Sequence, residues 1–108
     1  MADRVKVLTR IKGFTEAWHQ LSDGERQAWW EKLEAITDRA GGEWLVQCDS
    51  RWADEEYPFW GVMEYPSLEA CRQAVAENEE AGWYRYIVAT TLLGMDMHFQ
   101  PGERGVSA

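Results

Sequence analysis

Apolar side chains recur along this chain with two different periods, and each period predicts one kind of element. Residues 4–11 alternate between polar and apolar side chains, which is typical of a strand with one buried face. The apolar row of that strand is Val5, Val7, Thr9 and Ile11. Farther along, apolar side chains recur at helical spacing and predict one buried face of an α-helix. These residues are Trp29, Leu33, Ile36 and Ala40.

Both predicted main helices carry start and stop signals. Ser22 and Glu25 have the spacing of a capping box, in which each side chain accepts a hydrogen bond from the other residue's backbone N–H group. The Gly-Gly pair at residues 41–42 favours a helix C-terminus that ends in the left-handed backbone conformation. Ser67 predicts the start of the second helix and Gly82 its end. The second helix has a narrower apolar stripe, formed by Leu68, Cys71, Val75 and Asn78.

The remaining segments predict three strands and three connections. Strands are expected over residues 43–50, 58–65 and 87–97. An acidic loop over residues 51–57 joins the first two of these as a hairpin. We expect a short helical turn over residues 14–21 and a short aromatic connection over residues 83–86.

The order strand, helix, strand, strand, helix, strand predicts a ferredoxin-like α+β sandwich, in which a four-stranded antiparallel sheet carries both helices on one face. One domain is expected over residues 1–99 and a flexible tail over residues 100–108. The third strand is apolar on both faces, with Met63 pointing one way and Trp60 and Val62 the other. Helices cover only one face, so we expect a homodimer in which a second copy covers the other.

Two segments resemble the dimeric α+β barrel superfamily, which includes the antibiotic-biosynthesis monooxygenases and muconolactone isomerase. One is residues 59–70, where a strand passes into a capped helix, and the other is Gly82-Trp83-Tyr84. Within that superfamily, residues 21–26 and the Gly82 segment are most similar to a small subgroup of uncharacterised bacterial proteins. The resemblance spans residues 4–97.

The resemblance implies a pocket between the sheet and the helices that takes a hydrophobic or aromatic small molecule. It also implies that no cofactor is needed, because in many members the substrate itself reacts with oxygen or isomerises. The haem-binding members use a histidine in or near the second helix. This chain has none between Ser67 and Tyr86, which argues against a haem site of that type.

Composition and charge narrow the classes of partner. The net charge is −8 and no basic stripe is present, so nucleic acid and anionic membranes are poor partners. The chain starts directly into a strand rather than an apolar signal segment, and no apolar run reaches the roughly 20 residues of a membrane span. We therefore expect a cytoplasmic protein, with Cys48 and Cys71 as free buried thiols.

Four titratable residues are candidates for proton transfer: His19, Asp49, Glu64 and His98. Histidine titrates near neutral pH, and the alternative for His19 and His98 is an exposed or hydrogen-bonded structural role. Asp49 and Glu64 lie at the ends of apolar strands. Facing an apolar cavity they would have a raised pKa and could act as bases, and pointing to water they would be inert. The histidine spacings HxH and HxxxH are absent, so a metal site is not expected.

Ligand-binding candidates are one arginine and a set of aromatic side chains. Arg10 shares a row of the first strand with Arg4, and either could orient an anionic ligand or pair with an acid across the sheet. The chain holds seven tryptophans, many for one small domain, so we expect some aromatic rings to line a pocket rather than fill the core. The candidates are Trp44, Trp60, Trp83, Tyr84 and Tyr86.

These features favour a small enzyme of bacterial secondary or aromatic metabolism, of the cofactor-independent monooxygenase, isomerase or cyclase type. The enzymatic part of that expectation rests on the family resemblance alone. A second hypothesis is a non-catalytic protein that binds or carries a small molecule in the same pocket. A third is a haem protein with His19 or His98 as the axial ligand. Nucleophile elbows, phosphate loops and paired-cysteine motifs are absent, which excludes the common hydrolase, kinase and thioredoxin classes.

Overall fold

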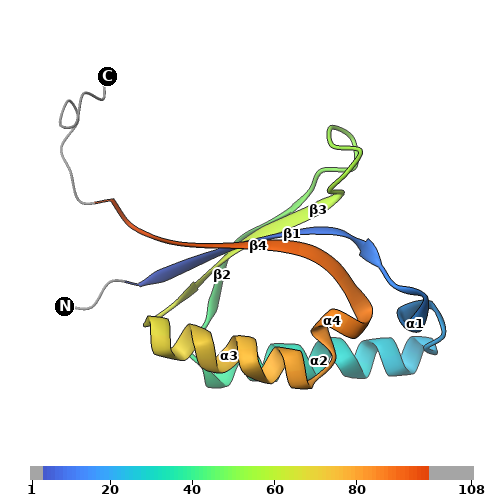
Figure 1. Ribbon diagram of the computed structural model, residues 1–108, viewed down its shortest axis with the longest axis horizontal. Coiled ribbons are helices and arrows are strands. Elements are labelled where there is room, and N and C mark those ends of the chain that lie inside the picture. Colours follow the sequence, from blue (N-terminus) through green and yellow to red (C-terminus); the bar gives the residue numbers. More distant parts are fainter. Residues whose placement is uncertain (1–3, 98–108) are drawn as a thin grey trace.

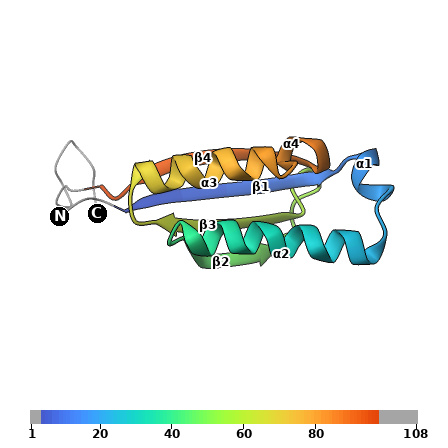
Figure 2. The same cartoon turned by 90° about the horizontal axis from the view of Figure 1, so that it is seen from below.

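The predicted order of elements is confirmed in a computed structural model that describes residues 4–97. Its elements are β1 (Val5–Phe14), α1 (Glu16–His19), α2 (Asp23–Arg39), β2 (Glu43–Asp49), β3 (Phe59–Tyr65), α3 (Leu68–Glu80), α4 (Trp83–Tyr86) and β4 (Ile87–Met95). The strands form one antiparallel sheet in the order β2-β3-β1-β4. The helices α2 and α3 lie side by side on one face (Figures 1 and 2). This is the ferredoxin-like α+β arrangement.

The helix ends follow the local signals. The Ser22 hydroxyl accepts from the Glu25 N–H at 3.1 Å, and the Glu25 carboxylate accepts from the Ser22 N–H at 2.9 Å, which confirms the capping box. Gly41 and Gly82 have φ angles of 75° and 105°, which L side chains rarely adopt, so glycine is required at both turns. The short aromatic connection expected over residues 83–86 forms one helical turn, α4.

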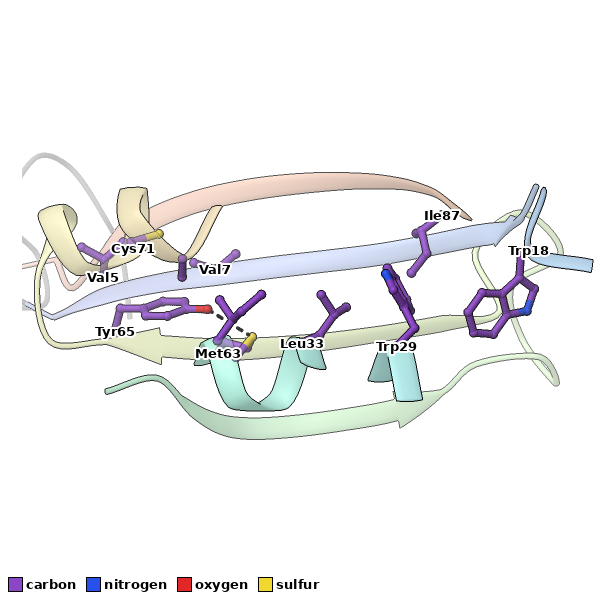
Figure 3. Close-up of a cluster of buried hydrophobic side chains, with 11 residues drawn as sticks. Val5, Val7, Trp18, Trp29, Leu33, Met63, Tyr65, Cys71 and Ile87 are labelled. Carbon is purple, nitrogen blue, oxygen red and sulfur yellow. Dashed lines mark hydrogen bonds between the residues drawn. The ribbon is translucent and has the colours of Figure 1, made fainter. Parts of the chain in front are cut away.

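The core lies between β1, β3 and the two long helices. Figure 3 shows Met63 of β3 beside Leu33 of α2, and Val5 of β1 beside Cys71 of α3. Cys71 and Ala74 of α3 are buried in the core, whereas Leu68 and Val75 of the same helix remain about half exposed. The buried stripe of α3 is thus narrower than predicted. Cys71 is a buried free thiol as expected, and the free Cys48 is only half buried.

Aromatic rings fill the end of the sandwich next to α1 and α4. The cluster consists of Phe14, Trp18, Trp29, Trp30, Trp83 and Tyr86. The Trp29 indole N–H donates to the Ala81 carbonyl at 2.8 Å and ties α2 to the end of α3. Packing within this cluster accounts for Trp18 and Trp29 without a ligand site.

The sheet face opposite the helices, called here the open face, carries apolar side chains in its middle. Strand register puts Leu8, Val62 and Trp60 on this face, with Val46 and Leu92 beside them on β2 and β4. Val46 is 40% exposed and Leu92 is 60% exposed.

Within residues 4–97, none of the helices has the length and apolarity needed to cross a lipid bilayer.

Candidate functional site

A cavity of about 980 Å³ lies between the sheet and the helices. That volume is at the upper end of the roughly 300–1,000 Å³ typical of small-molecule sites. Its walls come from β1, β2 and β3 on one side and from α2, α3 and α4 on the other. The apolar lining residues are Val7, Ile11, Leu33, Met63 and Val75, and the aromatic ones are Trp30, Trp44, Phe59, Trp60, Tyr65, Trp83 and Tyr84.

Trp44 lines this cavity and packs against the sheet. It faces the helices because it pairs with Met63 across the β2–β3 ladder. Its ring lies over Gly61, where an added Cβ atom would come within 2.7 Å of the Trp44 ring carbon Cζ3. Gly61 therefore provides the space in which the Trp44 ring lies against the sheet. Trp44 remains 50% exposed and offers a free aromatic face.

Asn78 lines the cavity and has an unpaired polar atom in its side chain. Its side-chain oxygen is buried and has no hydrogen-bond partner within the described part of the chain, and the residue lines the cavity. A buried acceptor without a donor costs about 1–3 kcal/mol, so a native protein rarely keeps one without a reason. The sequence pattern had placed Asn78 in the apolar stripe of α3 and gave no sign of an unpaired oxygen there.

The carboxylate of Asp49 lies at the cavity, and Arg51 holds it. The Arg51 side chain donates to both oxygens of Asp49 at 2.6–3.1 Å, and the Arg51 backbone N–H adds a bond of 3.0 Å. These hydrogen bonds keep the pKa of Asp49 below its ordinary value. The raised pKa considered from the sequence is therefore not found.

Glu64 lies on the open face and outside the cavity. Lys6 and Arg4 both form ion pairs with it, and the hydrogen bond from Lys6 and then that from Arg4 lower its pKa. The raised pKa that was one of the two alternatives for Glu64 is therefore not found. Arg10 also lies on the open face, with its guanidinium 4.3 Å from the centre of the Tyr57 ring. Arg4 pairs with Glu64 across the sheet, rather than being placed to orient an anionic ligand.

The remaining sequence candidates divide between the cavity and other places. Trp83 and Tyr84 line the cavity, and Trp60 borders it although its side chain belongs by register to the open face. Tyr86 packs against Trp18 and Trp29 in the aromatic cluster and is not among the lining residues, which corrects its assignment.

Neither histidine is placed at the cavity by the described residues. His19 is exposed at the end of α1 and is not among the lining residues, and His98 lies outside the described residues. Within residues 4–97, no group of three or more histidine, cysteine, aspartate or glutamate side chains is placed to hold a metal ion.

The fold is shared with other proteins of known structure. No protein-family model matches the sequence, and no curated protein matches it. Among solved structures, a protein of unknown function from Rhodopseudomonas palustris is 14% identical with a TM-score of 0.65, and the match covers 91% of this chain and 85% of that one. SnoaB, a cofactor-independent oxygenase from Streptomyces nogalater, is 16% identical with a TM-score of 0.54, and the match covers 93% of this chain and 99% of SnoaB. At these identities the likeness shows the fold alone.

Proposed function

We propose that this protein binds a hydrophobic or aromatic small molecule in the cavity between its sheet and helices. The observation that carries the proposal is a large, mainly apolar cavity whose lining includes Asn78, a residue with an unpaired side-chain oxygen. Apolar walls supply affinity, and a few placed polar groups orient the ligand. Trp44 would stack on the ligand while the oxygen of Asn78 accepts a hydrogen bond from it.

The reaction proposed for this site is cofactor-independent oxygenation or isomerisation, in line with the described activity of the structural neighbour SnoaB. In such an oxygenation, a substrate methylene becomes a carbonyl, one oxygen atom enters the product, and the other leaves as water with the two hydrogens. Asp49 is the only one of the four titratable candidates known to lie at the cavity. Its lowered pKa makes it a weak base, suited to a substrate with an acidic proton.

Binding is tested by calorimetry with naphthalen-2-ylmethanol, a neutral aromatic probe with one hydroxyl. We expect saturable binding, with one probe per chain. Val75→Trp would fill the cavity and weaken binding at least about tenfold. Leu68→Trp is the matched control, because it makes a similar change on a half-exposed position of the same helix outside the cavity lining. Absence of binding, or equal loss in both variants, would contradict the proposal.

Catalysis is tested by oxygen uptake with a panel of dihydroxynaphthalenes and by mass analysis of products. Asp49→Asn is expected to lower turnover by about 100-fold or more while leaving probe affinity within a few-fold. Saturable binding with no turnover of any panel member would favour the alternative of a non-catalytic carrier. The haem alternative has weaker support, because within residues 4–97 no histidine lines the cavity. It predicts a Soret band when haem is added.

The homodimer is a second part of the proposal. The open face carries Leu8, Val62 and the more exposed Val46 and Leu92 in one apolar strip. A sheet face of this kind is normally covered, and closed twofold pairing covers both copies at once. The loop between β2 and β3 rises on the same side of the sheet, away from the helices (Figure 1), and presents Trp52 at 88% exposure.

A further inference from the structure

Gly61 lies inside β3, on the sheet side of the cavity. A glycine in the interior of a strand weakens that strand and often marks a place where another group approaches closely. Unlike Gly41 and Gly82, Gly61 has no positive φ angle, so its backbone conformation is open to any L residue. The obstacle to a side chain at residue 61 is therefore a lack of space.

The Trp44 ring occupies the space above Gly61. A Cβ atom at residue 61 would lie 2.7 Å from Cζ3 and 3.3 Å from Cε3 of the indole, and 3.0 Å from the Val46 carbonyl oxygen. Carbon atoms in contact are normally about 3.5–4.0 Å apart, so a side chain there would push the indole roughly 1 Å away from the sheet. By contrast, a Cβ atom on Gly94 of β4 would have no atom of the described residues within 4 Å, apart from its neighbours in sequence.

A shift in strand register shapes β2 at the same place. The β2–β3 pairing shifts between Trp44 and Val46, so that Gln47 rather than Val46 lies opposite Gly61. In a regular ladder, Val46 would share the helix side of the sheet with Trp44, because residues two apart in a strand share a face. The extra residue, Leu45, turns Val46 to the open face instead. Bulges of this kind re-aim side chains and are frequent next to functional sites.

We propose that Gly61 is a positioning residue for Trp44 and thereby sets the size of ligand that the cavity accepts. The cavity lies between the sheet and the helices, so the height of the indole above the sheet determines the clearance at this point. With glycine at residue 61, the indole lies close to the sheet and leaves room for a larger ligand. With a larger residue, the indole moves toward the helices and narrows the cavity. This inference rests on the proposed binding function and adds to it a residue that determines specificity.

The test measures affinity by NMR titration, which also follows weak binding, with two probes that differ by one ring: naphthalen-2-ylmethanol and phenylmethanol. Gly61→Ala should weaken binding of the naphthyl probe at least about tenfold and that of the phenyl probe less than about threefold, because a narrowed cavity excludes the larger ring system first. Gly94→Ala is the matched control, since it adds the same methyl group to a strand glycine that has open space, and it should leave both affinities unchanged.

Removing the Trp44 ring separates this positioning role from a general effect on the sheet. In a Trp44→Leu background, Gly61→Ala should change either affinity less than about twofold, because the group that it displaces is gone. If Gly61→Ala alone does not fold, the double variant should still fold and bind as Trp44→Leu does.

Four outcomes would overturn this inference while leaving the cavity as a binding site. They are wild-type affinities in Gly61→Ala, equal loss for both probes, an undiminished effect of Gly61→Ala in the Trp44→Leu background, and a double variant that does not fold. Failure of both probes to bind the wild type would overturn the proposed function, and this inference with it.

Discussion

At the scale of single residues, the charged side chains have two different fates. On the open face they are paired, as Glu64 is with Lys6 and Arg4. Around the cavity, Glu34 and Asp38 make no ion pair within the described residues. Paired charges stabilise the fold, whereas like charges four residues apart on one helix, such as these two, repel each other. The two predictions that follow separate these roles.

Glu64 should make stability depend on pH in the acidic range. Its pKa is lowered from the ordinary value of 4.5 by Lys6 first and Arg4 second. The unfolded chain therefore binds a proton at higher pH than the folded one, and the stabilisation is complete above about pH 4.5 and is lost as pH falls through the lowered pKa. Urea unfolding at pH 7 and at lower pH should show that Glu64→Gln is less stable than the wild type at pH 7. The difference should shrink on acidification, and a gap that stays constant would contradict this assignment.

Asp38 should destabilise the C-terminal turn of α2. Asp38→Asn removes a negative charge from that turn and should raise the free energy of unfolding by about 0.5 kcal/mol. Thermal unfolding of this variant beside a matched Glu31→Gln control measures the effect. Destabilisation by Asp38→Asn would show that this carboxylate has a structural partner.

At the scale of elements, the helix α2 forms one long wall of the cavity and depends on its cap. Ser22→Ala removes the acceptor for the Glu25 N–H and should lower the free energy of unfolding by about 1 kcal/mol. Ser22→Thr keeps the hydroxyl and should lose much less. Chemical denaturation of the wild type, Ser22→Ala and Ser22→Thr measures these differences. Equal stability of the Ala and Thr variants would mean that the cap contributes little.

The elements were predictable because their signals are local, whereas the contacts of single residues were not. The apolar spacing from Trp29 to Ala40 and the capping box at Ser22 are independent of the rest of the fold. The pairing of Glu64 with Lys6 depends on strand register, which the sequence does not specify.

Two site residues show a second limit of the sequence. Asn78 shares a stripe with Cys71, but α3 buries Cys71 and turns Asn78 to the cavity, a distinction of helix orientation rather than of pattern. Tyr86 was assigned to the pocket by its neighbours in sequence and instead joins Trp18 and Trp29. For Asp49, the arginine two residues on was a readable signal that its charge would be paired.

At the scale of the whole molecule, the open face should govern assembly. Leu92→Glu places a charge in the apolar strip and should convert a dimer to a monomer, because burying an unpaired carboxylate is costly. Leu68→Glu, at a similarly exposed leucine on the first turn of α3, should remain dimeric. Light scattering after size exclusion measures both masses. A monomeric wild type, or dimers of both variants, would contradict pairing through this face.

The most direct test of the central claim is an NMR titration of the protein with naphthalen-2-ylmethanol. The side-chain amide signals of Asn78 and the indole N–H signals of Trp30, Trp44 and Trp83 should shift, because these groups line the cavity. The indole signal of Trp52 should stay fixed, because Trp52 lies in the exposed loop between β2 and β3. No shift, or shifts confined to Leu8, Val62 and Leu92 of the open face, would contradict a ligand site between the sheet and the helices.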